Sequence, residues 1–169
     1  KKHKTVARWT PGVNRRSVSE LALGMMLMIQ RNIYATVVAH KDGNWVKDGG
    51  LQLTGKTVGI VGMGHIGKDL VSLLKPFNCR LLANDILDQE HYYRSEGVIA
   101  RPLSELLMQS DFVSLHVPLN SSTKNLISHN QFKVMKNTAV LINTSRGPVV
   151  NQEALKQAQE ICKQEKKDF

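Results

Sequence analysis

The sequence predicts an α/β fold in which a parallel β-sheet is covered by helices on both faces, an arrangement described as doubly wound. Short apolar runs recur along the chain without the polar–apolar alternation of half-exposed strands, which is typical of strands buried on both faces. Segments of helical period separate these runs, as a parallel sheet requires. With 169 residues, 41% apolar and 22% charged, the chain has the size and composition of one globular domain.

The first predicted element is a long helical segment over residues 17–41. Ser17 and Glu20 have the spacing of a capping box, so we expect the helix to begin at Ser17. Apolar residues recur at helical intervals and also fill the other side, which predicts burial on more than one face. Residues 1–16 are expected to form a linker from a preceding domain, and the methionines of the helix are expected to serve as packing residues.

The sheet and its helices are expected over residues 55–158. Strands are predicted at 57–61, 79–83, 112–117 and 138–142, where the apolar runs stand. Helices are predicted at 64–74 (ended by Pro76), 91–96 (ended by Gly97), 104–108 and around 131–135. Asn151 is expected to cap a last helix, and the polar tail 159–169 is expected to fray.

Composition excludes several classes of protein. The two cysteines, Cys79 and Cys162, form neither a disulfide framework nor a metal-ligand spacing, so we expect no metal and a reducing compartment, the cytoplasm by default. The longest apolar stretch, residues 21–29, is far shorter than the roughly 20 residues of a membrane span, and no signal-peptide pattern is present. The net charge of +9 is scattered, without a basic patch interleaved with aromatic residues, so nucleic-acid binding is disfavoured and rests on charge alone.

The run Gly62-Met63-Gly64-His65-Ile66-Gly67 has the G-x-G-x-x-G spacing of a dinucleotide-binding turn, in a strand–turn–helix context. Gly62 would permit the tight turn, Gly64 the close approach of backbone to a pyrophosphate, and Gly67 the packing of helix on strand. Asp85 follows the next strand at about the expected spacing and would accept the hydroxyls of a ribose. Because Asp85 would repel a 2′-phosphate and no arginine immediately follows it, a Rossmann-type domain that binds NAD rather than NADP is predicted.

Two further strand ends carry polar residues. Arg146 closes Asn143-Thr144-Ser145-Arg146, and its planar guanidinium suits a carboxylate or a developing oxyanion, although a surface arginine in a loop would look the same. His116 ends another strand, and by itself it is more often a structural histidine than a catalyst. For His65 we assign only its backbone N–H to the site.

Several ordered motifs resemble the NAD-dependent D-isomer-specific 2-hydroxyacid dehydrogenases over roughly residues 5–158. They include Thr10-Pro11-Gly12-Val13-Asn14, Leu53-Thr54-Gly55-Lys56-Thr57, Leu115-His116-Val117-Pro118-Leu119 and the run of residues 135–147. Within the family, the chain is most similar to D-3-phosphoglycerate dehydrogenase-like members. The resemblance implies that Gly62, Gly64, His65, Ile66 and Gly67 cradle the pyrophosphate and that Asp85 holds the adenosine ribose. It also implies that His116, Val117, Pro118 and Thr123 line the adenine and cofactor edge, and that Thr144 and Ser145 approach the nicotinamide.

Arg146 matches the arginine with which the family orients a 2-keto acid. The family's catalytic histidine and its glutamate lie after this arginine, and the resemblance fades after Ala158. We therefore expect a cofactor-domain piece of the enzyme that binds NAD with negligible turnover by itself. The family's dimers, and the wide apolar surface of segment 17–41, predict a homodimer through this domain. The alternative is a non-catalytic, NAD-sensing binding module like the corepressors that share the fold.

Overall fold

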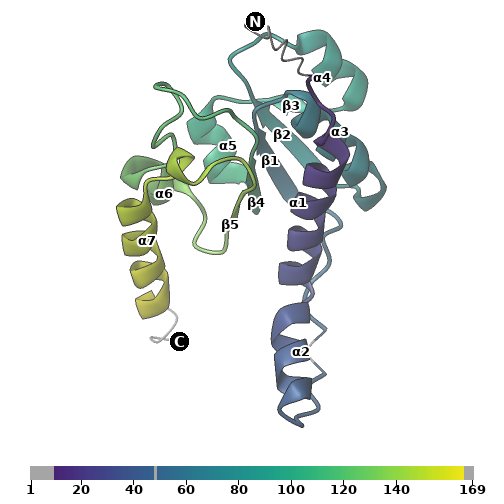
Figure 1. Ribbon diagram of the computed structural model, residues 1–169, viewed down its shortest axis with the longest axis vertical. Coiled ribbons are helices and arrows are strands. Elements are labelled where there is room, and N and C mark those ends of the chain that lie inside the picture. The colour runs from purple at the N-terminus through teal and green to yellow at the C-terminus, as the bar shows by residue number, and fades with distance from the viewer. Residues whose placement is uncertain (1–9, 48, 166–169) are drawn as a thin grey trace, which may run out of the picture.

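The computed structural model describes residues 10–47 and 49–165, in which a five-stranded parallel sheet has the order β3-β2-β1-β4-β5 (Figure 1). The strands are β1 (Thr57–Val61), β2 (Arg80–Asn84), β3 (Ile99–Ala100), β4 (Phe112–Leu115) and β5 (Val140–Asn143). In the register, Val58 pairs with Leu81 on one side and with Phe112 on the other. The chain thus winds outward in both directions from β1, which confirms the predicted doubly wound arrangement.

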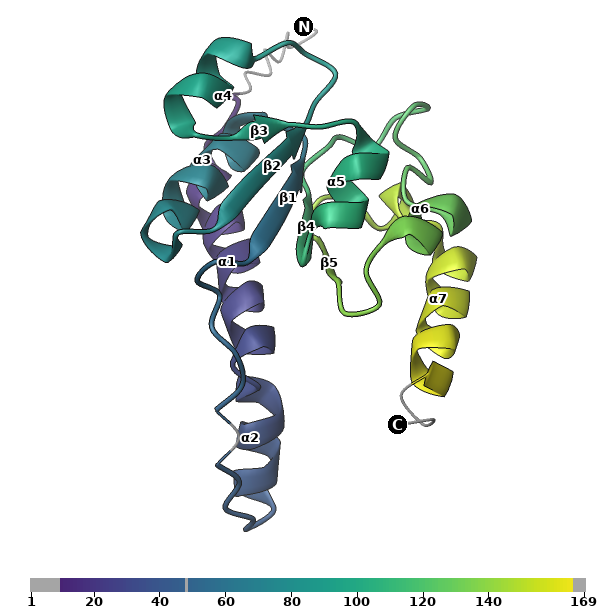
Figure 2. The ribbon, with the colours of Figure 1, turned by 180° about the vertical axis from the view of Figure 1, so that it is seen from behind.

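Helices cover both faces of the sheet (Figure 2). One face packs against α1 (Arg15–Gln30), α3 (His65–Leu74) and α4 (Glu90–Glu96), and the other against α5 (Leu103–Gln109), α6 (His129–Val134) and α7 (Gln152–Glu165). The neighbouring β4 residues Phe112 and Val113 are both buried, and they belong to opposite cores. A strand covered on both faces has no polar side to expose, which explains the continuous apolar runs.

The predicted strands are observed with small shifts. The first is as predicted, β2 begins one residue later, β4 ends at Leu115, and β5 runs from Val140 to Asn143. The shifts follow from pairing, because Phe112 lies opposite Val140 and Leu115 opposite Asn143, so each strand ends where its neighbour ends. The two-residue β3 is too short to carry a periodic pattern and was not predicted.

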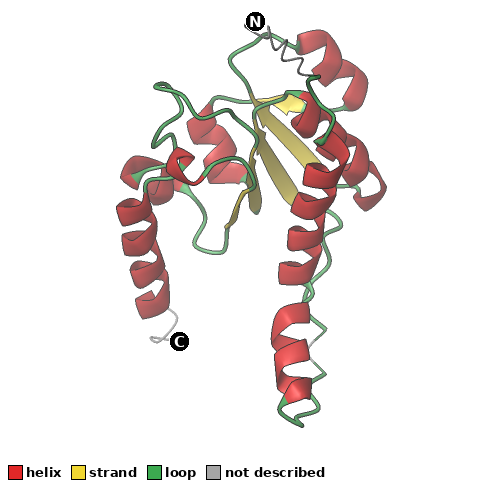
Figure 3. Cartoon of the chain, in the orientation of Figure 1, coloured by secondary structure: helices red, strands yellow, loops and turns green. Residues whose placement is uncertain are grey.

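The predicted 17–41 segment consists of two helices, α1 and α2 (Ile33–Lys41), which are bent by 64° relative to each other (Figure 3). Asn32 stands at the break in the left-handed conformation, with φ 51°. The prediction that Ser17 caps the first helix is wrong. The chain already turns at Gly12, whose carbonyl accepts from Arg15 N–H at 3.1 Å, and the Ser17 hydroxyl donates to the Asn14 carbonyl at 3.0 Å.

Burial of α1 is confined to one face, contrary to the prediction of several. Ser19, Ala22 and Met26 are buried against α3, and no described residue of α2 is buried. In both views α2 extends away from the sheet, which leaves it little of this chain to pack against (Figures 1 and 2). No single described helix is long and apolar enough to cross a membrane, and α1 and α2 reach that length and composition only as a bent pair.

Asn151 caps α7 as predicted, its side-chain oxygen accepting from Ala154 N–H at 3.0 Å. The helix then continues to Glu165, so the described part of the tail expected to fray is helical. The rest of that tail, residues 166–169, and residues 1–9 of the predicted linker lie outside the described residues.

Candidate cofactor-binding site

The turn after β1 has the geometry that the glycine spacing predicts. Gly62 lies at φ +95°, a conformation that side chains disfavour, and its N–H donates to the Asn84 carbonyl at 2.9 Å. A Cβ at Gly62 would lie 2.5 Å from the carbonyl oxygen of His116. The turn is therefore closely packed between the ends of β2 and β4, and only glycine fits.

Gly67, in the first turn of α3, brings this helix against the glycine turn. A Cβ at Gly67 would lie 2.3 Å from the Gly62 carbonyl oxygen, well below any normal contact. The absence of that atom lets the N-terminus of α3 start directly above the end of β1.

The start of α3 is open to a ligand. Gly64 is the N-cap and has no side chain to cap the helix, and a Cβ added there would lie more than 4 Å from every other described residue apart from its chain neighbours. The first-turn N–H groups, which include those of His65 and Ile66, have no acceptor within the helix, and the first turn holds no acidic residue. This helix end therefore offers unobstructed N–H donors and partial positive charge, as an anion requires.

Asp85 follows β2 and holds the glycine turn from the side. Its Oδ2 accepts from Met63 N–H at 2.5 Å and its Oδ1 accepts from Leu87 N–H at 2.8 Å. Each carboxylate oxygen has a second lone pair, so these bonds fix the side chain and still leave it able to accept from a ligand.

His116 follows β4 and is largely enclosed. Its backbone N–H donates to the Val61 carbonyl at 2.7 Å, and its ring nitrogen Nε2 lies 2.8 Å from Ser114 Oγ. Nδ1 is buried and has no hydrogen-bond partner among the described residues. Burial lowers the pKa of His116 to about 4, so the ring is neutral near pH 7. This geometry supports the structural interpretation of the histidine.

One cavity of about 320 Å³ joins the ends of these segments. Seven of the predicted residues line it: Gly62, Gly64, Asp85, His116, Val117, Pro118 and Thr123. Thr123 also organises the loop after β4, because its hydroxyl donates to the Pro118 carbonyl at 2.5 Å and accepts from Asn120 N–H at 2.9 Å. The cavity is therefore built from the carboxyl ends of β1, β2 and β4, where open α/β sheets bind ligands.

Sequence reasoning missed the other residues of this cavity. They are Val61, Asn84, Ile86, Leu87, Asn120, Ser122 and Leu126. For two of them the signal was their position, because the apolar residues Ile86 and Leu87 directly follow Asp85 in the sequence. In the structure they are 99% and 65% exposed.

Thr144, Ser145 and Arg146 stand at the end of β5 and do not line this cavity. Asn143 organises them: its side-chain oxygen accepts from Ser145 N–H and Oγ–H at 3.1 and 2.7 Å, and its nitrogen donates to the Arg146 carbonyl at 2.9 Å. The Thr144 hydroxyl is buried without a hydrogen-bond partner among the described residues.

The Arg146 side chain is exposed, and its Nη1 donates to the Ser145 carbonyl at 2.8 Å. Because a guanidinium has five N–H groups, several stay available to an anion. The carboxyl edge of the sheet thus carries a cavity over β1, β2 and β4, followed by a cationic side chain beyond β5. The described residues contain no group of three or more His, Cys, Asp or Glu side chains that could hold a metal ion.

Comparison with known proteins agrees with this geometry. The NAD-binding-domain model of the D-isomer specific 2-hydroxyacid dehydrogenases matches residues 23–163. A hydroxypyruvate reductase from Thermotoga maritima is 38% identical over 148 residues, which cover 86% of this chain and 47% of that protein. A D-3-phosphoglycerate dehydrogenase from Methanocaldococcus jannaschii is 34% identical over 88% of this chain and 29% of its own length.

Among solved structures, D-lactate dehydrogenase from Aquifex aeolicus, complexed with NAD and lactic acid, superposes with a TM-score of 0.85 and 30% identity. The match covers 90% of this chain and 46% of that one, so the chain spans about half the length of such relatives or less. The chain therefore belongs to the D-isomer specific 2-hydroxyacid dehydrogenase family, of which it forms the NAD-binding domain.

Proposed function

We propose that this chain holds NAD across the carboxyl edge of its sheet, as the cofactor half of an oxidoreductase acting on a small D-2-hydroxy acid. The observation that carries the proposal is the single cavity that joins the glycine turn, Asp85 and the His116–Pro118 segment. Its 320 Å³ is sufficient for part of a dinucleotide, and the rest would extend along the open edge toward β5.

The residues present fit this cofactor. The space above Gly64, which a side chain would fill, and the N–H groups of α3 suit the pyrophosphate. Asp85 retains acceptor capacity for a ribose diol. The Thr144 hydroxyl, which is buried and has no partner in the described part of the chain, suits a polar group of the nicotinamide end. His65 and Ile66 would contribute backbone N–H only.

When bound, NAD accepts or supplies a hydride at the nicotinamide C4. Arg146 would bind the substrate carboxylate through the guanidinium N–H groups that Ser145 leaves available, and so orient the substrate. The same positive charge would stabilise the oxygen at C2 as it becomes anionic. The catalytic histidine and glutamate of the family are not assigned to any residue among 10–165. We therefore expect these 169 residues alone to bind NADH without measurable turnover of glyoxylate, hydroxypyruvate or pyruvate.

Fluorescence titration of the chain with NADH tests the cofactor site. The variant Asp85→Asn keeps the acceptor oxygen for Met63 or Leu87 N–H but removes the charge that the diol prefers, so we expect NADH to bind about tenfold more weakly. Arg146→Gln serves as a control and should leave NADH affinity within about twofold. The proposal would be refuted if NADH at millimolar concentration, on the order of 1 mM, produced neither a fluorescence change nor heat of binding in a calorimetric titration. It would also be refuted if Asp85→Asn bound NADH more tightly than the parent chain.

Homodimerisation is supported by the exposed apolar side chains of α1 and α2. Leu21, Ile29, Ile33 and Val37 are 45–52% exposed and Tyr34 is 71% exposed, although these residues are apolar or aromatic. We propose that a second copy covers this surface. Sedimentation velocity should show a dimer at micromolar concentration and a monomer for Val37→Glu. A monomeric parent chain would contradict this assignment.

The free thiols of Cys79 and Cys162 support a reducing compartment such as the cytoplasm.

A further inference from the structure

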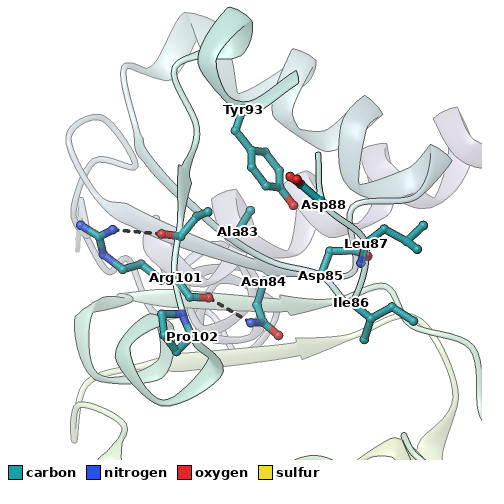
Figure 4. Close-up of a pocket in the computed structure, with 10 residues that line it drawn as sticks. Ala83, Asn84, Asp85, Ile86, Leu87, Asp88, Tyr93, Arg101 and Pro102 are labelled. Atoms are coloured by element: carbon teal, nitrogen blue, oxygen red, sulfur yellow. Dashed lines mark hydrogen bonds between the residues drawn. The ribbon is translucent and has the colours of Figure 1, made fainter. Parts of the chain in front are cut away.

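A second cavity lies on the far side of the turn that carries Asp85 (Figure 4). Its volume is about 360 Å³, and it lies between the turn after β2 and the turn after β3. Residues 84–87 line both cavities and so form a shared wall. None of the glycine-turn residues and none of residues 116–126 line this second cavity, which is thus distinct from the proposed cofactor cavity.

The cavity is acidic on a chain that is strongly basic overall. Asp85 and Asp88 both line it, and no ion pair among the described residues involves either of them. Asp88 Oδ1 accepts from Glu90 N–H at 2.9 Å, and its Oδ2 has no hydrogen-bond donor among the described residues. The chain has a net charge of +9, so the negative charge that these two carboxylates place at the cavity contrasts with the positive charge of the chain as a whole.

Arg101 also lines the cavity, but its guanidinium is engaged elsewhere. Its Nη1 donates to the Ala100 carbonyl at 2.9 Å, and its Nε lies 3.5 Å from Glu105 Oε2. In Figure 4 the guanidinium points away from Asp88. The charge of Arg101 is therefore balanced by Glu105 and does not neutralise the two aspartates.

Tyr93 supplies the observation that points to a ligand. The residue is only 7% exposed, its hydroxyl has no hydrogen-bond partner among the described residues, and Figure 4 shows that hydroxyl directed toward Asp88. Burial, followed by the charges of Asp85 and Asp88, raises the pKa of Tyr93, so the hydroxyl stays protonated. A buried hydroxyl without a partner is costly, and a ligand that bonds to it removes that cost.

The lining selects the class of ligand. A bare metal ion would find only two carboxylates here, and the volume is much larger than an ion needs. The remaining lining is largely apolar and includes Ala83, Leu87 and Pro102. Acceptor oxygens beside apolar surface match a molecule with a cationic N–H donor on a short hydrocarbon chain.

We infer that this cavity binds a small primary alkylammonium ion. Its N–H groups donate to the free Asp88 oxygen and the Tyr93 hydroxyl, and its methylene groups lie against Leu87 and Pro102. Because Asp85 belongs to both cavities, binding here is linked to the ribose end of the cofactor cavity, and the linkage must be equal in both directions.

The test is a titration of the 169-residue chain with butylammonium chloride at constant ionic strength, followed by amide proton–nitrogen correlation spectra. We expect shifts centred on residues 85–88, 93 and 101 and a Kd on the order of 1 mM, as for one charge-assisted hydrogen bond with modest apolar contact. Tetramethylammonium has the same charge without N–H donors and should shift these amides weakly. Shifts scattered over the surface, or equal shifts with both cations, would overturn the inference.

Two variants test the named partners. Asp88→Asn keeps the acceptor for Glu90 N–H but removes the charge, and should weaken butylammonium binding at least about fivefold. Tyr93→Phe removes a hydroxyl that has no hydrogen-bond partner among the described residues, so the fold should keep or gain stability while binding weakens about threefold. Glu160→Gln, an exposed change of equal charge on α7, is the matched control and should have no effect. Unchanged affinity in Asp88→Asn would overturn the inference.

The titration is repeated with saturating NADH to separate the two cavities. Residual butylammonium binding, weakened by no more than about threefold, agrees with two sites that share a wall. Complete loss would place the amine in the cofactor cavity and overturn the inference. Because the first titration needs no cofactor, failure of the proposed NAD site and failure of this second site give different results.

Discussion

The substitutions Gly67→Ala and Gly64→Ala separate the two roles of glycine in the turn after β1. At Gly67 an added Cβ would lie 2.3 Å from the Gly62 carbonyl oxygen and 3.3 Å from Ile60 Cγ2. Neither neighbour is the end of a flexible chain, so α3 must move away from the turn. Overpacking of this kind costs about 1–3 kcal/mol. For a domain of this size, that corresponds to a decrease in Tm of about 3–10 °C.

The same movement displaces the N–H groups at the start of α3. Losing one charge-assisted hydrogen bond to a phosphate weakens binding by roughly tenfold to a hundredfold. We therefore expect Gly67→Ala to lose both stability and NADH affinity. Thermal unfolding followed by circular dichroism and titration followed by NADH fluorescence measure the two effects on the same samples.

Gly64→Ala is the matched control for stability. Gly64 has φ −73°, which alanine adopts readily, and no described residue beyond its chain neighbours lies within 4 Å of the added atom. The free protein should therefore lose less than about 1 kcal/mol of stability. NADH affinity should nevertheless fall at least about tenfold, because the methyl group occupies the space proposed for the pyrophosphate. If Gly64→Ala binds NADH like the parent chain, the pyrophosphate does not approach Gly64. If Gly67→Ala keeps its Tm, the packing argument fails.

Three further predictions concern packing and protonation. His116 has its pKa lowered by burial from 6.5 to about 4, so the unfolded chain binds more protons between these values. The stability that this pKa shift contributes should be fully present above pH 6.5. The free energy of unfolding should then decrease by on the order of 3 kcal/mol as the pH is lowered from 6.5 through 4. Urea unfolding at several pH values should show this dependence flattened in His116→Gln. Asp69→Ala should destabilise the chain by about 1–3 kcal/mol in the same assay, because Asp69 accepts from the buried Ser19 hydroxyl and joins α3 to α1. An unchanged urea midpoint would mean that this contact adds nothing. Gly59→Ala should lower Tm by several degrees, since its Cβ would lie 2.3 Å from Ser110 Oγ, and a normal Tm would show that α5 can yield.

Much of the fold could be predicted because its determinants are local. The strand 57–61, the turn at Gly62 and the helix to Leu74 depend on a short apolar run, on glycines and on the following Pro76, all within one stretch of chain. Asn151 capped its helix as expected for the same reason. The predicted N-cap at Ser17 failed because a hydrogen bond between Gly12 and Arg15 starts the turn earlier.

Other features depend on contacts between segments that are distant in sequence. The one-sided burial of α1 depends on the contact that this helix makes with α3, which the residues of 17–41 do not specify by themselves. The same holds for α2, which contains no buried residue. The boundaries of β4 and β5 follow from their register with each other. The two-residue β3 exists only because β2 offers it an edge.

For the site, the sequence alone determined which candidate residues are present, and these are the residues for which we propose the chemistry: glycines where backbone must approach backbone, an aspartate after β2, and an arginine after β5. Only the tertiary structure decided how they are arranged. It turned the Asp85 carboxylate onto Met63 N–H, enclosed His116, and kept Arg146 out of the cavity that Asp85 lines. It also placed Asp88 and Tyr93 around a second cavity behind that turn. The physical reason is that backbone conformation is set by neighbours in the chain, whereas burial, charge balance and cavity shape are set by neighbours in space.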